Sequence, residues 1–428
     1  MINSAIVLYS IPAFFILIGI ELLITRLKDR HHYSMNDAIT SIGCGVSSEV
    51  VGIFIKSFFF IGYLFIYENY KLMSLSNSFW SWTILFFGVD FFYYWFHRKS
   101  HEVNAIWATH IVHHQSEDYN LSTALRQAWF QPAFSWVFYL PLAWVGFSPE
   151  MFVAVKGVNL VYQFWIHTKW IGKLGFLEWF MNTPSHHRVH HGKNPKYLDK
   201  NYAAVFIIWD RIFGTFQEEE EEPVYGTTKA LESFNPIWTN FHYWVELFAL
   251  AGKCSRLTDK IKVFIKPPGW QPEELGGFQH APEVNKGVYR KYTVPINRSV
   301  SLYVLIQFIA VVLFSALMLF DSASEQPMLF QTQMQQYYAA FIFVFTLLNG
   351  GGMFELKSWV RFMEFGRLFS VLLFPAFFHG QSGFVGLFII TVCYAMASLV
   401  WLIPIQKHLL PANVANTINT GQSNYPSE

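Results

Sequence analysis

Long runs of apolar residues, separated by short polar stretches, dominate this chain. A helix needs about 20 apolar residues to cross the hydrocarbon core of a bilayer. Runs of spanning length lie at 5–25, 40–67, 79–96, 128–146, 150–166, 299–320, 336–353 and 383–404. A shorter run at 368–378 fits a short span or a re-entrant segment. The pattern predicts an all-α fold, a polytopic integral membrane helix bundle.

The first run, "AIVLYSIPAFFILIGIELLIT", has the position of a secretory signal peptide. It lacks the basic residues that open such a peptide and the small-residue cleavage site that closes one. We therefore expect it to be retained as a membrane helix.

The composition agrees with a membrane protein. Hydrophobic residues make up 53% of the chain and charged residues only 14%, against about 25% charged in soluble domains. The formal net charge is +1, which excludes a nucleic-acid partner on electrostatic grounds. Cys44, Cys254 and Cys393 lie far apart and form no CxxC motif, which excludes a disulfide framework and a thiolate metal site.

Lysine and arginine predict the orientation, because short cytoplasmic loops are enriched in both. Arg26, Lys28 and Arg30 follow the first run, and the stretch "WFHRKSHE" follows the third. The polar region 167–298 is also rich in lysine. We expect these segments in the cytoplasm, in a plasma or inner membrane or in the endoplasmic reticulum.

Ten of the 16 histidines fall in four groups in the first half of the chain. The groups are His97 and His101; His110, His113 and His114; His167; and His186, His187, His190 and His191. Residues three and four apart share one face of a helix, so each motif could aim two or three ring nitrogens at one point. All these histidines lie near predicted helix ends on one side of the membrane.

Such crowding predicts a metal site. Neutral imidazole binds iron, zinc and copper, whereas buried imidazoles without partners are costly. Nine histidines exceed the needs of one ion and suit two, while the role of His186 stays open. The remaining histidines are expected to be ordinary polar residues at the membrane interface: His31, His32, His242, His280, His379 and His408.

Other polar residues near the motifs are candidates for supporting roles. Asp90 lies in an apolar run, Glu102 adjoins His101, and Gln163 precedes His167 by four residues. Each could accept a hydrogen bond from a ligating histidine. Arg126 could meet a lipid phosphate or form a salt bridge. The run of glutamates at 218–222 is expected to be a solvated loop.

The order HxxxH, HxxHH, single His, HxxHH resembles the fatty acid hydroxylase and sterol desaturase superfamily, which are integral membrane enzymes with a histidine-bound di-metal centre. The stretches "FHRKSHEVNAIWATHIVHHQ", "YQFWIHT" and "NTPSHHRVHHGKNPKYLDKNYAAVFIIWDRIFGTF" look most like its alkylglycerol monooxygenase branch. Glu102, directly after the second histidine, also fits that branch.

The resemblance implies a monooxygenase with two iron ions, for which zinc could substitute in purified protein. It implies nine metal ligands: His97, His101, His110, His113, His114, His167, His187, His190 and His191. It also implies a lipid substrate from the bilayer, O₂, and tetrahydropterin as electron donor. The reaction is then hydroxylation of the carbon next to the ether oxygen of an alkylglycerol. We predict Glu102 and Asp90 as the catalytic carboxylates.

Other functions stay open. Within the superfamily, a sterol or fatty acyl hydroxylase or desaturase would use the same motifs. A metal transporter would place histidines at several depths of the membrane, and a metal or haem sensor would need no substrate cavity. The sequence does not predict the oligomeric state.

The chain is expected to divide into five regions. An N-terminal span and loop at 1–34 precede the hydroxylase-like catalytic region at 35–240. A cytoplasmic connector at 241–298 leads to C-terminal spans at 299–410, and the polar tail at 411–428 is expected to be disordered.

Overall fold

A computed structural model describes residues 2–284, 289–324, 326–381 and 384–409. These residues are helical or irregular and contain no strand, which confirms the predicted all-α fold. Two compact units are present. The N-terminal unit holds residues up to 231 and 238–291, and the C-terminal unit holds 232–237 and the chain from 292. The predicted tail at 411–428 lies outside the described residues.

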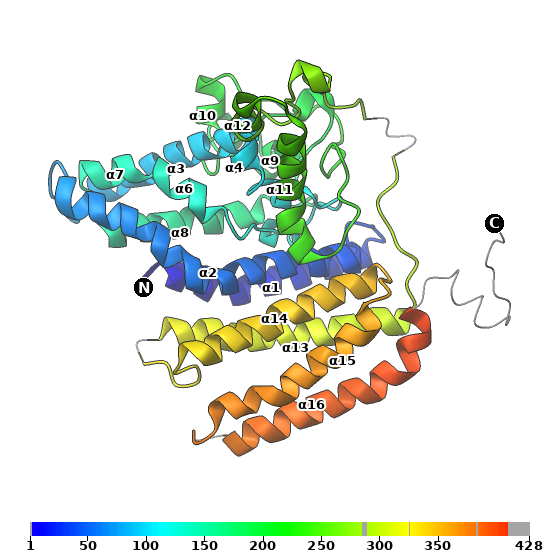
Figure 1. Ribbon diagram of the computed structural model, residues 1–428. Coiled ribbons are helices and arrows are strands. Elements are labelled where there is room, and N and C mark those ends of the chain that lie inside the picture. The colour runs from blue at the N-terminus through cyan, green and yellow to red at the C-terminus, as the bar shows by residue number, and fades with distance from the viewer. Residues whose placement is uncertain (1, 285–288, 325, 382–383, 410–428) are drawn as a thin grey trace. The chain divides into compact units, whose positions relative to one another are not determined.

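Long helices form the body of the N-terminal unit (Figure 1). They are α1 (Ile2–Leu27), α2 (Met35–Tyr70), α3 (Phe79–Glu102) and α8 (Pro149–Trp165). The side chains of Ser78 and Ser148 cap α3 and α8, each accepting a hydrogen bond from a backbone N–H in the first turn. Apolar side chains from α2, α3 and α8 form one buried core, with Tyr63, Leu85 and Phe152 among them.

The run at 128–146 does not form the single spanning helix that its hydrophobicity predicts. It forms two short helices, α6 (Pro132–Phe138) and α7 (Leu140–Val145). Pro132 and Pro141 each occupy the start of their helix, since proline lacks a backbone N–H and disrupts a helix interior. Neither helix is long enough to cross a bilayer.

Five described helices are long and apolar enough to cross a membrane, so the chain is a multi-pass membrane protein. These segments are Tyr9–Leu27, Met35–Lys56, Arg298–Ala323, Gln333–Phe354 and Phe384–Leu409. The runs at 79–96 and 150–166 are helical, as α3 and α8, but do not belong to this set. Spans at those two places therefore stay a prediction.

The C-terminal unit packs α13 (Arg298–Ala323), α14 (Gln333–Phe354), α15 (Val360–Leu373) and α16 (Phe384–Ile405). The run at 368–378 covers the end of α15 and the short 3₁₀-helix η5 (Phe374–Phe378). A buried ion pair between Glu364 and Arg367, 2.6 Å apart, lies inside this unit. Gln307 of α13 and Asn349 of α14 bond to the pair, which satisfies charges that would otherwise be costly in an apolar setting.

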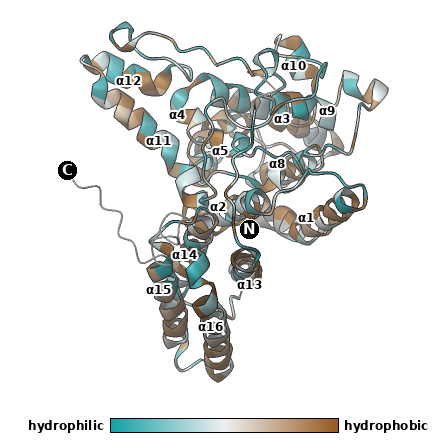
Figure 2. Cartoon of the chain, turned by 90° about the vertical axis from the view of Figure 1, so that its right-hand side faces the viewer, coloured by the Kyte–Doolittle hydropathy of each residue, from teal (hydrophilic) through white to brown (hydrophobic). Residues whose placement is uncertain are grey.

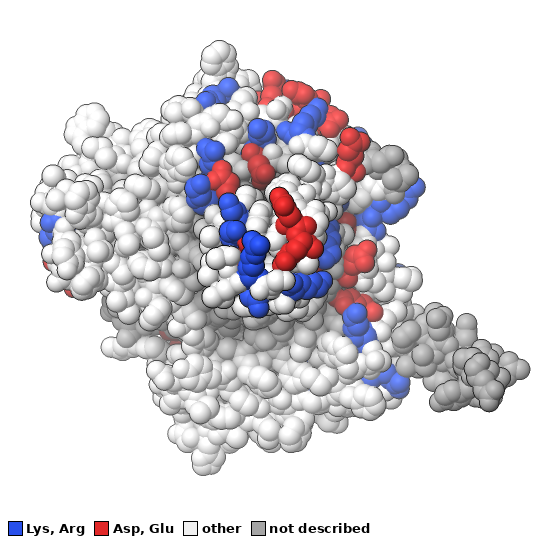
Figure 3. Space-filling model, turned by 45° about the horizontal axis from the view of Figure 1, so that its top comes forward, with Lys and Arg blue, Asp and Glu red and all other residues white. Residues whose placement is uncertain are grey.

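Mostly short elements, together with the longer helix α11, make up the rest of the N-terminal unit near the C-terminal end of α3 (Figure 1). They are α4 (Asn104–Trp107), α5 (Ile111–His114), η1 (Thr123–Leu125), η2 (Gly175–Trp179), α9 (Pro184–His190), η3 (Pro195–Tyr197), α10 (Ile208–Ile212), α11 (Pro236–Lys253), α12 (Leu257–Ile265) and η4 (Glu273–Leu275). Figure 3 shows charged side chains gathered on one part of the surface, beside large areas without charge. His97 and His101 lie at the C-terminal end of α3, and the other histidine motifs belong to the short elements and loops around it.

Candidate metal centre

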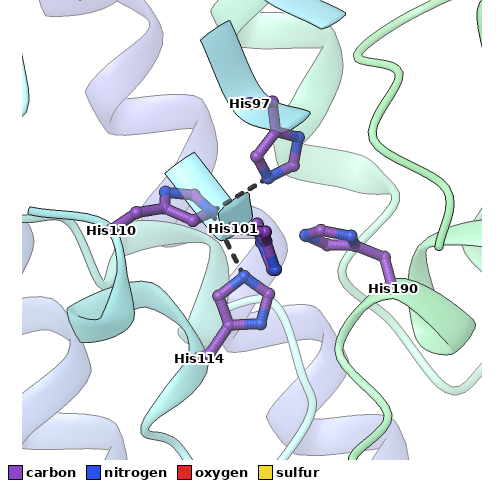
Figure 4. Close-up of side chains that lie close together, drawn as sticks. All are labelled: His97, His101, His110, His114 and His190. Carbon is purple, nitrogen blue, oxygen red and sulfur yellow. Dashed lines mark hydrogen bonds between the residues drawn. The ribbon is translucent and has the colours of Figure 1, made fainter. Parts of the chain in front are cut away.

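The structure brings all nine predicted ligands together in two buried groups. The first cluster is His97, His101, His110, His114 and His190 (Figure 4). The second cluster is His113, His167, His187 and His191. Within each cluster the potential ligand atoms all lie within 4.8 Å of one another. Each group therefore has the dimensions of a site for one metal ion.

Their spacing alone predicted that each HxxHH motif aims its ring nitrogens at one point. In the structure, each motif instead divides its histidines between the two clusters. His110 and His114 join the first cluster, whereas His113 between them joins the second. In and directly after α9, His187 and His191 join the second cluster, whereas His190 joins the first. Residues four apart stay on one face of a helix, but their neighbours point about 100° away. Each motif thus contributes to both clusters and holds them side by side.

Backbone carbonyls orient four of the rings through their Nδ1 atoms. The pairs are His97 with Tyr202 at 2.6 Å, His113 with Arg126 at 3.0 Å, His167 with Gln163 at 2.7 Å, and His190 with Lys200 at 2.9 Å. A carbonyl oxygen only accepts, so each Nδ1 carries the proton. In a neutral ring the Nε2 atom is then unprotonated, and its lone pair can bind a metal.

These lone pairs face one another. His113 Nε2 and His167 Nε2 lie 3.2 Å apart, although both rings donate Nδ1–H elsewhere. Neither Nε2 then has a proton to share, and two lone pairs at this distance repel. In addition, the Nε2 atoms of His101, His190 and His191 are buried without a hydrogen-bond partner among the described residues. A bound cation in each cluster would satisfy these atoms, so the residues fit two metal ions.

The spacing of the nitrogens agrees with one ion in each cluster. The contacts between Nε2 atoms measure 2.9 Å for His97 and His110, 3.2 Å for His110 and His114, 3.0 Å for His167 and His187, and 3.2 Å for His113 and His167. Two nitrogens that each lie about 2.1 Å from one metal are about 3.0 to 3.4 Å apart. The rings therefore have the separation of ligands around a common ion.

Burial keeps the rings neutral. Desolvation, and then the neighbouring histidines, lower the pKa of His114 and His191 well below the usual value of 6.5. Desolvation lowers the pKa of His113 to about 4, although its bond to the Arg126 carbonyl opposes the shift. At neutral pH the second nitrogen of each ring is thus available to a metal.

Acid is expected to release the metal between about pH 6.5 and pH 4. Ordinary histidine takes up a proton near pH 6.5, whereas the buried ring of His113 does so only near 4. The opened form therefore binds more protons as the pH falls through this window, and stability falls with it. Metal content after dialysis at stepped pH checks this. Loss that starts above pH 7.5, or full retention at pH 4, contradicts it.

Arg188 of α9 connects two segments that carry histidines of the second cluster, α9 itself and the loop after His167. Arg188 donates to the Glu219 carboxylate through Nε at 2.8 Å and Nη2 at 2.7 Å. Its Nη1 donates to the carbonyls of Thr168 at 3.0 Å and Ile171 at 2.7 Å. Arg188 thus ties α9 to the loop that carries His167.

The glutamate run at 218–222 is therefore more than the solvated loop that the sequence predicted. The side chain of Glu219 is only 16% exposed, because it pairs with Arg188. The other four contact Lys173, Lys196, Asn194 and Lys169 in turn. The run fastens the segment around α9 by several contacts at once.

Replacing Arg188 by glutamine is expected to lower metal content of the second cluster while the first cluster stays filled. Glutamine cannot form the bidentate pair, so Glu219 and two carbonyls lose a partner. We expect the affinity for one of the two metals to fall about 10- to 100-fold. This is the usual range for a residue that orients the metal ligands without binding the metal itself. Competition with a chelator measures it. Lys196→Gln, on the exposed Glu220 pair, is the control and should change nothing.

Asp90 is buried and does not contact a cluster histidine in its hydrogen bonds. Its carboxylate accepts from Asn159 Nδ2 at 2.8 Å, from the backbone N–H of Val205 at 2.9 Å and Phe206 at 3.0 Å, and from Trp209 Nε1 at 2.9 Å. These bonds fix the segment after Tyr202, whose carbonyl orients His97. The geometry gives Asp90 a positioning role, and its catalytic role stays a prediction.

Glu102 lies at the end of α3, where Arg98 and Lys99 donate to its carboxylate at 2.7 and 2.5 Å. Partial burial alone would raise the pKa of Glu102, but these hydrogen bonds lower it, so the group is ionised. Its hydrogen bonds do not include a cluster histidine. A catalytic role for Glu102 also stays a prediction.

The structure also places three other candidates. Arg126 is 2% exposed, donates to the Val112 carbonyl at 3.0 Å and lies 3.5 Å from the Asp37 carboxylate. It therefore forms the salt bridge that the sequence offered as one of two interpretations, and it does not face a lipid phosphate. Gln163 supports His167 through its backbone carbonyl and not through its side chain. His186 is buried outside both clusters, with Nε2 3.9 Å from a Glu178 carboxylate oxygen.

Glu21 of α1 is a supporting residue that the sequence analysis missed. It is 5% exposed, and its carboxylate accepts from Thr168 Oγ1 at 2.5 Å, from the Leu121 N–H at 2.8 Å and from the Tyr33 hydroxyl. Thr168 follows the ligand His167. The signal was present, since an ionisable residue inside an apolar run is functional or structural by default.

Comparison with known proteins places the chain. The fatty acid hydroxylase family model matches residues 82–215. Human alkylglycerol monooxygenase is 40% identical over 372 residues, which cover 86% of this chain and 82% of the relative. The Danio rerio enzyme of the same name is 43% identical over 69% and 67%, and the Caenorhabditis elegans one is 33% identical over 89% and 78%. No solved structure matches.

The matched region contains every histidine of both clusters, and the similarity to the human relative extends over most of the chain. The resemblance of the motifs is thereby confirmed. This chain belongs to the alkylglycerol monooxygenase family, and it is an oxygen-dependent, membrane-bound lipid monooxygenase.

Proposed function

We propose that this enzyme hydroxylates the carbon next to the ether oxygen of an alkylglycerol, using two iron ions at the histidine clusters and tetrahydropterin as electron donor. One oxygen atom of O₂ enters the C–H bond, and two electrons from the pterin with two protons convert the other to water. The product is a hemiacetal, which breaks down to an aldehyde and glycerol. The reaction therefore cleaves the ether lipid.

The observation that carries the proposal is the pair His113 and His167. Their Nε2 atoms face each other at 3.2 Å while both Nδ1 atoms are held by carbonyls. This arrangement supports a cation bound by neutral imidazole, and imidazole suits iron. Bound iron supplies the redox chemistry that activates O₂, which no side chain of the chain provides by itself.

The protein's own groups orient the ligands and exclude water. The carbonyls of Tyr202, Arg126, Gln163 and Lys200 keep the rings in one tautomer. Burial of all nine histidines excludes bulk water, which protects an oxidising site from side reactions. By the distribution of lysine and arginine, we place the clusters on the cytoplasmic side, where a soluble reductant could reach them.

The two clusters also bear on the alternatives. A transport path needs ligands at successive depths, whereas here His110, His113 and His114 of one short segment serve both clusters. This favours a fixed centre over a metal transporter. A sterol or fatty acyl hydroxylase or desaturase would use the same centre, so the substrate decides between these activities.

The test uses full-length protein from iron-supplemented cells, in lipid nanodiscs. We expect about two iron atoms per chain and release of a fatty aldehyde from 1-O-alkylglycerol that depends on O₂ and tetrahydropterin. With ¹⁸O₂, the label should enter the aldehyde. Activity on a sterol or acyl lipid with NADPH and a cytochrome, and none on the ether lipid, would overturn the substrate. About one metal per chain, or fewer, would overturn the di-metal centre.

A further inference from the structure

Two helices of the N-terminal unit expose large apolar side chains in regular stripes. On α11, Phe241, Val245 and Phe248 are 38%, 52% and 64% exposed. On α12 a second stripe, Leu257, Ile261 and Ile265, is 74%, 55% and 57% exposed. Spacings of three and four residues place each set on one face of its helix. Contiguous apolar faces of this kind mark interaction surfaces.

The exposed stripes are not the contact surface between α11 and α12. Other apolar side chains of α11 and α12 already form a buried cluster, with Leu247, Ala251 and Val263 among them, and this cluster includes Ala108 next to α4. Phe248 itself touches Phe264 of α12, with ring centroids 5.2 Å apart. A surface helix of a soluble protein buries its apolar face and exposes a polar one. These two helices differ, because each has apolar side chains both inside the protein and on its surface. Figure 2 shows brown and teal on both helices.

Basic residues flank the exposed stripe of α12. Lys260 and Lys262 lie on either side of it around the helix. Lys253 is the last residue of α11, and Arg256 directly precedes α12. The acidic residue of α12, Asp259, is buried and pairs with Lys262 at 2.8 Å. An apolar stripe between lysines is the composition of a helix that lies in the headgroup region of a bilayer.

The direction of α11 agrees with such a position. In Figure 1, α11 is inclined at a steep angle to the direction of α1, α2, α3 and α8 of the same unit. Two of these, α1 and α2, contain candidate membrane spans. A helix that is steeply inclined to spanning helices lies close to the plane of the membrane. Its exposed stripe can then face lipid along its whole length.

We propose that α11 and α12 form a hairpin that docks on the bilayer surface at headgroup depth, with Phe241, Val245, Phe248, Leu257, Ile261 and Ile265 inserted among the lipids. The occupant of the stripes is lipid, because the hairpin belongs to a protein that is already in the membrane and its lysines complement lipid phosphates. A second copy of the chain would bring like charges together.

The hairpin is fastened to the scaffold of the first cluster. The Asn104 N–H donates to the Lys266 carbonyl at 3.0 Å, and Asn104 Nδ2 donates to the Val263 carbonyl at 2.8 Å. The Tyr243 hydroxyl of α11 donates to Asn104 Oδ1 at 2.6 Å. Asn104 follows the ligand His101 by three residues. A docked hairpin thus holds the lipid surface beside the first cluster, and this holds whichever lipid is the substrate.

The test places a fluorescent probe on each stripe of the full-length protein in nanodiscs. Phe248→Cys and Ile261→Cys are labelled in a Cys393→Ser background, since Cys44 and Cys254 are buried. Glu222→Cys is the control, because the Glu222 side chain is 76% exposed in the charged run. Lipids with a spin label near the headgroup and aqueous iodide serve as the two quenchers.

We expect the spin-labelled lipid to quench both stripe positions several-fold more than the control, and iodide to show the reverse order. Iodide quenching of the stripes equal to that of Glu222→Cys overturns the proposal. Protection from both quenchers also overturns it, since that result indicates a protein partner. If either variant fails to fold, Val245→Cys and Ile265→Cys probe the same stripes one turn away.

Discussion

Replacing His190 by alanine is expected to remove one of two metal ions and to lower oxygenase activity more than about 100-fold. His190 belongs to the first cluster, and its Nε2 is buried without a partner among the described residues while its Nδ1 is held by the Lys200 carbonyl. Loss of a residue that only orients the ligands lowers metal affinity or activity about 10- to 100-fold. Loss of a ligand itself should therefore exceed that range. Elemental analysis and turnover measure both effects.

His186→Ala is the matched control. His186 lies on the same helix and is 1% exposed, yet it belongs to neither cluster. We expect a modest loss of thermal stability, two metals per chain and activity close to that of the unaltered protein. Two metals retained in His190→Ala, or one lost in His186→Ala, would contradict the assignment of ligands.

Replacing Glu21 by alanine is expected to empty the second cluster and spare the first. The change leaves the Thr168 hydroxyl and the Leu121 N–H buried without their acceptor. Each unsatisfied donor destabilises the folded protein by about 1–3 kcal/mol. Thr168 adjoins His167, so the loop that presents this ligand loses its anchor on α1. We expect metal content to fall from about two to about one per chain.

Two comparisons make this result specific. Glu49→Ala removes an exposed pair with Lys56 on α2 and should leave both metals in place. Combining Glu21→Ala with His190→Ala should remove both ions, because the two changes act on different clusters. Unchanged metal content in Glu21→Ala would show that α1 does not position His167.

Much of the site can be predicted from the sequence, because the patterns that indicate it are local in the chain. Spacings of three and four on a helix, and the order of four histidine motifs, single out the nine residues that the structure gathers in two clusters. The length of the apolar runs predicts an all-helical membrane protein for the same reason, since one helix must satisfy its own backbone in lipid. Periodicity and composition need no knowledge of distant contacts.

The assignment of each histidine to its cluster depended on packing. His113 and His167 are 54 positions apart, and nothing in either motif says that they share a site. The same holds for the carbonyls that select the tautomers, for the pair of Arg188 with Glu219, and for the anchor at Glu21. The division of the run at 128–146 is different, because its cause is local: proline begins each of the two helices, and hydrophobicity alone does not register proline.

The physical reason is the range of the interactions. Helix periodicity and hydrophobicity act between neighbours in the chain, so the sequence by itself determined the all-helical class, the membrane class and the identity of the nine clustered histidines. Hydrogen bonds and charge pairs between distant segments form only where packing brings the groups within about 3 Å. Which ring meets which carbonyl, and how the histidines divide between the two clusters, was decided only by the tertiary structure.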